Sequence, residues 1–166
     1  MQKNYGKEKS EKVFNNLVQL VKIQDAWEAP LILHELLRER DSSINISHKD
    51  LPSIEDHMRF LRSEPYRVWN LVKVKDNYVG SIYLSKANEI GVFILKKYRG
   101  NGYGVSAIKK LMAENKVPRW WLANVNPKNK TSEKIFVGLG FKHIQNTYAL
   151  TAVSNESDIE DGDAAN

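Results

Sequence analysis

The chain of 166 residues contains no cysteine, which excludes disulfide bonds, thiolate zinc sites and a cysteine nucleophile. Its four histidines have no metal-ligand spacing such as H-x-x-x-H, so we expect no metal site. No apolar run approaches the roughly 20 residues that span a bilayer, and the residues after Met1 lack an apolar signal-peptide core. We therefore expect a cytoplasmic protein with no membrane association.

Length and composition are typical of one globular domain. Hydrophobic residues make up 42% and charged residues 27% of the chain. Five acids and no base lie in residues 151–166, so residues 1–150 hold 25 basic and 15 acidic side chains, a net charge of +10. A basic body suits a polyanionic cofactor, a polyanionic substrate or nucleic acid, although a solvated lysine-rich surface is the commoner source of such a charge. No nucleic-acid-binding motif accompanies the charge, so nucleic acid is not the expected partner.

Local patterns predict the order of the elements. We expect a flexible arm at 1–12, one domain at 13–153 and a disordered acidic tail at 154–166. A capping box at Asp25 and Glu28 predicts a helix to about Arg40, with Pro30 predicting a kink or a late start. The other expected elements of the first half are a strand at Leu17–Ile23, a helix at Ile54–Arg62 capped by Ser53, and strands at Tyr66–Val74 and Tyr78–Leu84 around a turn at Asp76–Asn77.

A glycine-rich turn then connects a strand to a helix. The apolar run Glu89–Leu95 predicts a buried strand, and Val105–Met112 has helical spacing. Between them Gly100, Gly102 and Gly104 remove side chains from the turn, so its backbone N–H groups and the helix dipole can bind an anion such as a pyrophosphate. The spacing fits neither the dinucleotide fingerprint, which needs glycine at Val105, nor the P-loop.

Two motifs in the second half carry a resemblance to a known family. Arg99-Gly100-Asn101-Gly102-Tyr103-Gly104 matches the pattern R/Q-x-x-G-x-G/A, and Asn129, Ser132, Phe136 and Gly140-Phe141 follow with a second fixed spacing. In this order they resemble the signatures of the GCN5-related N-acetyltransferases (GNAT), and the resemblance covers residues 17–150. It implies an α/β fold with a twisted, mixed, mostly antiparallel sheet of six to seven strands and helices on both faces. A parallel strand at Arg119–Val125 and closing strands at Lys142–Ile144 and Thr147–Ala152 would complete that sheet.

The resemblance implies acetyl-coenzyme A as co-substrate. The pyrophosphate would bind the glycine turn, and the backbone of the preceding strand would pair with pantetheine and polarise the thioester carbonyl. Asn129 could instead be a simple helix N-cap. The residues expected to hold the cofactor are Val92, Phe93, Ile94, Arg99, Gly100, Asn101, Gly102, Tyr103, Gly104, Asn129, Ser132 and Phe136.

The catalytic groups are less clearly marked. Many family members have tyrosine at the position of Phe136, whose hydroxyl protonates the departing thiolate, so here the thiolate leaves unassisted or another donor such as Tyr148 or a water serves. The acceptor ammonium must lose a proton before it attacks. Glu89, at the start of the cofactor strand, is the first candidate base and His48 is the second.

The sequence also carries indications of the acceptor. Residues 46–49 and 55–60 faintly resemble acetyltransferases that act on nucleotide-linked amino sugars, and Trp69, Tyr83 and Tyr148 could line an acceptor cleft. We expect a small-molecule amine acceptor and a monomer or homodimer. The alternatives are a protein or peptide amine, and a non-catalytic module that binds coenzyme A or nucleic acid, which Phe136 and the basic body would favour.

Overall fold

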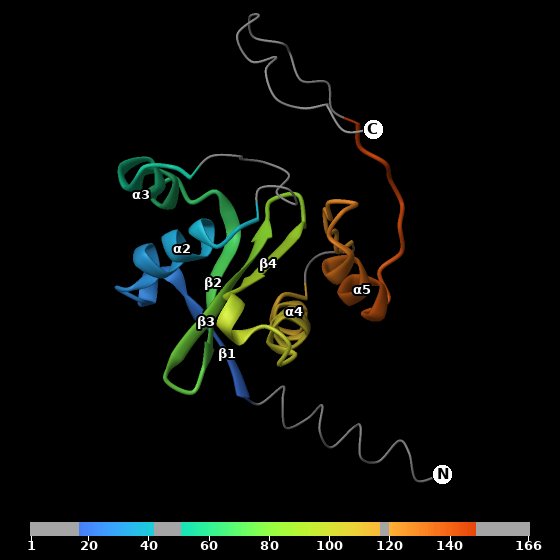
Figure 1. The fold of residues 1–166 in the computed structure, drawn as a ribbon, viewed down its shortest axis with the longest axis horizontal. Coiled ribbons are helices and arrows are strands. Elements are labelled where there is room, and N and C mark those ends of the chain that lie inside the picture. The colour runs from blue at the N-terminus through green and yellow to red at the C-terminus, as the bar shows by residue number, and fades with distance from the viewer. Residues whose placement is uncertain (1–16, 42–50, 117–119, 149–166) are drawn as a thin grey trace, which may run out of the picture.

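The computed structural model describes residues 17–41, 51–116 and 120–148. Its centre is a four-stranded antiparallel sheet in the order β1-β2-β3-β4 (Figure 1). The strands are β1 (Val18–Lys22), β2 (Tyr66–Val74), β3 (Asn77–Ser85) and β4 (Ile90–Ile94). The helices are α2 (Ala29–Arg38), α3 (Ile54–Arg62), α4 (Tyr103–Glu114) and α5 (Lys130–Gly138), with short 3-10 turns η1 (Ile23–Asp25) and η3 (Lys96–Tyr98).

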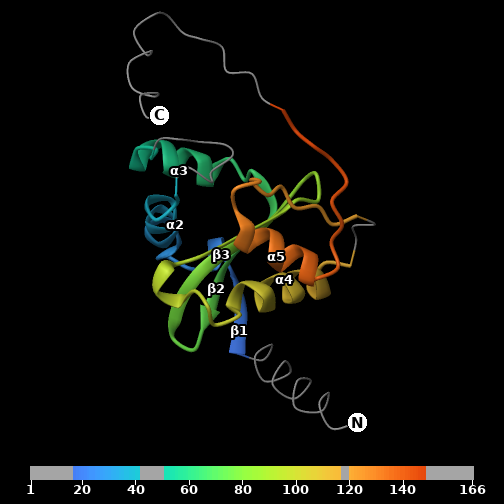
Figure 2. The same ribbon diagram turned by 45° about the vertical axis from the view of Figure 1, so that its right-hand side comes forward.

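The helices cover both faces of the sheet, so the molecule has three layers. Figure 2 shows α2 and α3 on one side of the strands and α4 and α5 on the other. The core accordingly has two parts. On the α4 and α5 side, Ile82, Leu84 and Ile90 pack with Ile108 and Phe136. On the α2 side, the buried residues are Ala26, Ala29, Leu33, Leu36, Leu71 and Leu95. The expected α/β architecture with helices on both faces is confirmed.

The first half of the chain follows the sequence prediction with two corrections. The side chain of Ser53 caps α3 by accepting the Asp56 N–H at 3.1 Å, as expected. The predicted capping box at Asp25 is wrong, because residues 23–25 form the turn η1 and α2 begins only at Ala29. Proline is tolerated in the first turn of a helix, so the late start anticipated from Pro30 is what the chain adopts. The hairpin turn lies one residue earlier than expected, because Val74 pairs with Asn77.

The second half departs further from the expected sheet. Residues 120–125 meet β4 in one parallel bridge, between Glu89 and Leu122, where a full parallel strand was expected. Residues 142–148 form no strand and are exposed, so the expected strand at Lys142–Ile144 is absent. Within the described residues, four of the expected six to seven strands are present. The expected arm at 1–12, the tail at 154–166 and most of the last expected strand lie outside the described residues. No helix of the described chain is long and apolar enough to cross a bilayer.

Candidate active site

The glycine turn forms an open cradle at the N-terminus of α4. Gly100 and Gly102 adopt left-handed backbone conformations, with φ of 80° and 74°, which side chains rarely adopt. A β-carbon built on either residue would have no protein atom within 4 Å. Gly102 is the N-cap of α4, no side chain caps this end, and the first amides of a helix have no intrahelical acceptor. These N–H groups and the positive end of the helix dipole are therefore available to an anion.

The side chains of the turn tie it to β4. The side-chain amide of Asn101 donates to the backbone carbonyls of Tyr98 and Arg99, each at 3.2 Å, and so closes the turn. Arg99 Nε donates to the Ile94 carbonyl at 2.9 Å, and its guanidinium lies over the ring of Phe93 at 5.2 Å. A β-carbon on Gly104 would touch Ile94 at 3.6 Å, an ordinary contact between helix and strand. The cradle is thus fixed at the end of β4.

The edge of β4 is open beside the cradle. Ile90 N–H donates to the Leu122 carbonyl at 2.8 Å, and Leu122 N–H donates to the Asn88 carbonyl at 3.0 Å. In the described chain, this bridge is where the pairing of residues 120–125 with β4 ends. Hydrogen bonding alternates along a strand, so the peptide groups of Val92 point to the same edge as those of Ile90, while those of Phe93 face β3. The two segments form a fork whose open part begins at Val92.

Glu89 lies at the closed end of this fork. Its half-buried carboxylate accepts hydrogen bonds from Ser85 Oγ at 3.1 Å and from the side-chain amide of Asn124 at 2.8 Å. Asn124 belongs to the segment that leaves β4, so these bonds join both arms of the fork. The two donors hold the carboxylate in one orientation.

The second sequence motif starts α5. The Asn129 side chain accepts the Ser132 N–H at 3.1 Å, so Asn129 caps the helix. Phe136 is buried at 7% exposure and packs edge-to-face on Phe141, with ring centroids 5.1 Å apart. The left-handed Gly140, with φ of 91°, follows the end of the helix. Cap, core residue and terminating glycine all have structural roles here, independently of any ligand.

Of the other two predicted catalytic residues, only Tyr148 lies among the described residues. Tyr148 is 90% exposed and belongs to the segment that runs outward beyond α5 (Figure 1). His48 lies outside the described residues. Within those residues, no group of three or more metal-binding side chains gathers.

An aromatic cluster covers the α2 and α3 face near the fork, and sequence analysis identified only part of it. Tyr83 and Trp69 were expected, but Tyr66 stacks flat on Tyr83 with ring centroids 3.9 Å apart, and Phe60 meets Trp69 edge-on at 5.9 Å. Burial, and then the neighbouring Tyr83, raise the pKa of Tyr66 to about 12, so this phenol stays protonated. No local pattern marks Tyr66, because a register shift between Tyr66 and Val68 decides which face of β2 it occupies.

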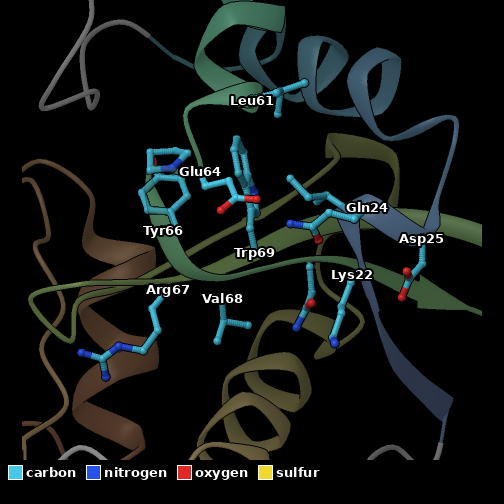
Figure 3. A pocket seen from close by; sticks show the side chains of 12 residues that line it. Lys22, Gln24, Asp25, Leu61, Glu64, Tyr66, Arg67, Val68 and Trp69 are labelled. Carbon is cyan, nitrogen blue, oxygen red and sulfur yellow. The ribbon is translucent and has the colours of Figure 1, made fainter.

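A separate pocket of about 530 Å³ lies at the opposite edge of the sheet (Figure 3). It opens where β1 ends at Lys22 while β2 continues to Tyr66, and β3 separates it from β4. Lys22, Gln24, Asp25, Glu64 and Trp69 are among its lining residues. Tyr66 and Trp69 of the aromatic cluster also line this pocket, but it contains none of the predicted cofactor residues, so we place the cofactor site at the fork.

Comparisons with solved structures agree on the fold. The chain is similar to an acetyltransferase from Thermus thermophilus (TM-score 0.63, 21% identity, 78% of this chain and 89% of that chain). It is also similar to the microcin C7 self-immunity acetyltransferase MccE in complex with acetyl-CoA and AMP (TM-score 0.57, 19% identity, 77% and 80%). A third similar structure is the ribosomal-protein-alanine N-acetyltransferase from Brucella melitensis (TM-score 0.59, 15% identity, 78% and 86%).

A match to a family model is more specific than these likenesses of fold. No curated protein matches the chain in sequence. The model of the Acetyltransferase (GNAT) family matches residues 31–141, which include the glycine cradle, the fork and the helix that Asn129 caps. The chain therefore belongs to the GNAT acetyltransferase family.

Proposed function

We propose that this protein transfers an acetyl group from acetyl-coenzyme A to the primary amine of a small molecule by direct attack. One observation carries the proposal: an unfilled anion cradle at Gly100 and Gly102 adjoins the open edge of β4. A diphosphate and a thioester chain need these two features side by side. The similar structure of MccE was solved with acetyl-CoA, which supports the same ligand here.

The residues of the cradle would bind the pyrophosphate of the cofactor, and those of the strand would bind its pantetheine chain. The amides of Tyr103 and Gly104 would bind the pyrophosphate, with Asn101 holding the turn and Arg99 supplying positive charge. The peptide group of Val92 and the N–H of Ile94 would pair with pantetheine as a neighbouring strand does, because the Ile94 carbonyl already accepts Arg99 Nε. The side chain of Phe93 packs on the α2 side of the sheet. Asn129, Ser132 and Phe136 would border the cofactor from α5. An N–H at Val92 would stabilise the oxyanion of the tetrahedral intermediate.

Glu89 is the proposed base. The acceptor arrives as an ammonium, and Glu89 takes its proton directly or through a water, so that the nitrogen lone pair can attack the thioester carbon. The new C–N bond forms, the nitrogen releases its second proton to solvent, the C–S bond breaks, and the coenzyme A thiolate departs. Phe136 has no hydroxyl with which to protonate that thiolate. A thiol has a pKa far below that of an alcohol, so the thiolate can leave without an acid.

Two glycines with left-handed backbones, Gly102 and Gly140, allow a matched test of the cradle. Gly102→Val would place a branched side chain in the anion space, whereas Gly140→Val imposes comparable left-handed strain at the end of α5, also without a protein atom within 4 Å. Coenzyme A affinity is measured by calorimetry, and thiol release from acetyl-coenzyme A is followed across a panel of amines. We expect at least a roughly tenfold loss of affinity for Gly102→Val alone, because at least one charge-assisted hydrogen bond is lost.

The same measurements can overturn the proposal. Equal coenzyme A affinity in the wild type and in Gly102→Val would place the cofactor elsewhere. Tight coenzyme A binding without acetylation of any amine in the panel would show that the protein is a non-catalytic coenzyme A-binding module. Turnover of peptide amines alone would replace the small-molecule acceptor with a protein.

A further inference from the structure

The layer of β4 that faces α2 carries charged groups at both ends of an aromatic wall. Alternation along the strand puts Glu89, Gly91 and Phe93 on this face, because Ile90, Val92 and Ile94 pack on the α4 side. A β-carbon on Gly91 would lie 2.0 Å from Tyr83 Cζ and 2.4 Å from its hydroxyl oxygen, so the phenol of Tyr83 rests on bare backbone. Tyr66 stacks on the outer side of that ring at 3.9 Å.

The negative end of this layer is the carboxylate of Glu89, and the positive end is at Phe93. The guanidinium of Arg40 lies over the Phe93 ring at 5.7 Å, and that of Arg99 lies over it at 5.2 Å. Glu89 and Phe93 are four residue steps apart along the strand, about 13 Å between their Cα atoms. Besides burial and Tyr83, which raise the pKa of Tyr66 most, Arg40 lowers that pKa and Glu89 raises it. Tyr66 therefore lies within electrostatic range of both ends.

Arg99 and Arg40 are held in place by different parts of the chain. Arg99 belongs to the cofactor turn and donates to the Ile94 carbonyl. Arg40 follows α2, on the acceptor side of the sheet. The preceding residue fixes its position, because the Glu39 carboxylate accepts the Lys96 N–H at 2.7 Å and so pins this helix end to the chain just after β4. Arg40 is therefore held at the positive end independently of the cradle.

From this arrangement we infer that the acceptor carries an anionic group, a phosphate or carboxylate, several bonds from its amine, and that Arg40 binds the anion. The inference rests on the proposed function and names its substrate class. The amine lies toward Glu89 and the open peptide group of Val92, where the proton is removed. The anion lies toward the planar guanidinium, which recognises phosphates and carboxylates through paired hydrogen bonds. The stacked rings of Tyr66 and Tyr83 bound the part of the acceptor between the two charges.

Matched acceptors test the inference on the full chain. Glucosamine and glucosamine 6-phosphate differ only in the phosphate, and ω-amino carboxylates of increasing length are paired with alkylamines of the same length. We expect the anionic member of the best pair to have a kcat/KM about tenfold higher or more, the contribution of a charge-assisted hydrogen bond. Arg40→Gln should raise KM for the anionic acceptor, leave its kcat, and leave the neutral acceptor unchanged. Arg40→Lys should restore part of the preference.

Arg38→Gln is the matched control, because it removes the same charge from the same helix end. Binding is followed separately by thermal shift of the coenzyme A-saturated protein with each acceptor of a pair, which needs no turnover. The inference is overturned if wild type and Arg40→Gln have the same ratio of kcat/KM for the anionic over the neutral acceptor. It is also overturned if Arg40→Gln lowers kcat/KM equally for both acceptors. The absence of any anion-dependent binding or turnover overturns it as well. Calorimetry of coenzyme A distinguishes these results from failure of the proposed function, which would show as lost cofactor binding.

Discussion

The phenol of Tyr83 lies so close to the backbone of Gly91 that no side chain fits between them. The ring cannot simply move aside, because Tyr66 stacks on it at 3.9 Å and Trp69 meets Tyr66 edge-on at 4.9 Å. Glycine at position 91 therefore allows the aromatic wall to lie directly on β4. The position of this aromatic wall therefore depends on the absence of a side chain at position 91.

Gly91→Ala is expected to displace Tyr83 from its stack. The crowding should lower the free energy of unfolding by about 1–3 kcal/mol and raise KM for the acceptor, while coenzyme A affinity stays the same. Urea unfolding and calorimetry measure these effects. Gly138→Ala is the control, because its β-carbon meets no atom within 4 Å and alanine favours the helix. An unchanged free energy of unfolding in Gly91→Ala would show that Tyr83 and Tyr66 can shift without cost to stability.

Glu89→Gln should lower kcat by roughly 10²- to 10⁴-fold near neutral pH, the usual contribution of a general base. The loss should shrink at high pH, where the acceptor amine is already deprotonated and needs no base. The pH dependence of thiol release measures this. Glu55→Gln, an exposed charge change on α3, should leave the profile unchanged. A loss of the same size at every pH would assign Glu89 a structural role through Ser85 and Asn124.

Elements set by neighbouring residues could be predicted from the sequence. The bounds of β2 match the expected Tyr66–Val74, and α3 begins after the Ser53 cap as its sequence indicates. The glycine turn was predictable for the same reason, since β4 ends at Ile94 and α4 begins at Tyr103, so strand, turn and helix are consecutive in the sequence. The family resemblance predicted a parallel strand at Arg119–Val125, but it did not predict that residues 120–125 would pair beside β4 through Leu122 alone.

Features that depend on distant residues could not be predicted. Simple alternation puts Tyr66 and Trp69 on opposite faces of β2. A register shift between Tyr66 and Val68 inserts an extra residue, which turns Tyr66 toward Tyr83. Arg40 likewise reaches Phe93 only because Glu39 binds the chain after β4, 57 residues away. No local pattern indicates either contact.

Two substitutions of Asn129 can test its role in helix stability separately from its proposed role in cofactor binding. Asn129→Ala should lower the free energy of unfolding by about 1 kcal/mol, because the Ser132 N–H loses its acceptor. Asn129→Asp keeps an acceptor and should retain that stability, yet it places a negative charge where we propose that a polyanion binds, so coenzyme A affinity should fall. Urea unfolding and calorimetry on both variants test this. Normal affinity in Asn129→Asp would limit Asn129 to capping.

The imidazole of His57 should make the fold less stable in acid. His57 is 3% exposed, its Nε2 has no hydrogen-bond partner, and the ring meets His34 edge-on at 5.6 Å. Burial lowers its pKa below 6.5, the hydrogen bond to the Pro30 carbonyl opposes this, and the charge of His34 lowers the pKa further. As the pH falls below about 6.5, the unfolded chain therefore binds a proton that the folded chain resists.

The free energy of unfolding should thus decrease from about pH 6.5 downward, by at most about 1.4 kcal/mol per pH unit from this residue, until the folded-state pKa is reached. His57→Leu should flatten this part of the profile, because the buried group no longer titrates. His143→Gln, an exposed control, should leave the slope unchanged. Urea unfolding at several pH values between about 7.5 and 5 measures all three proteins. An identical slope in His57→Leu and the wild type would mean that α3 releases His57 to solvent before it is protonated.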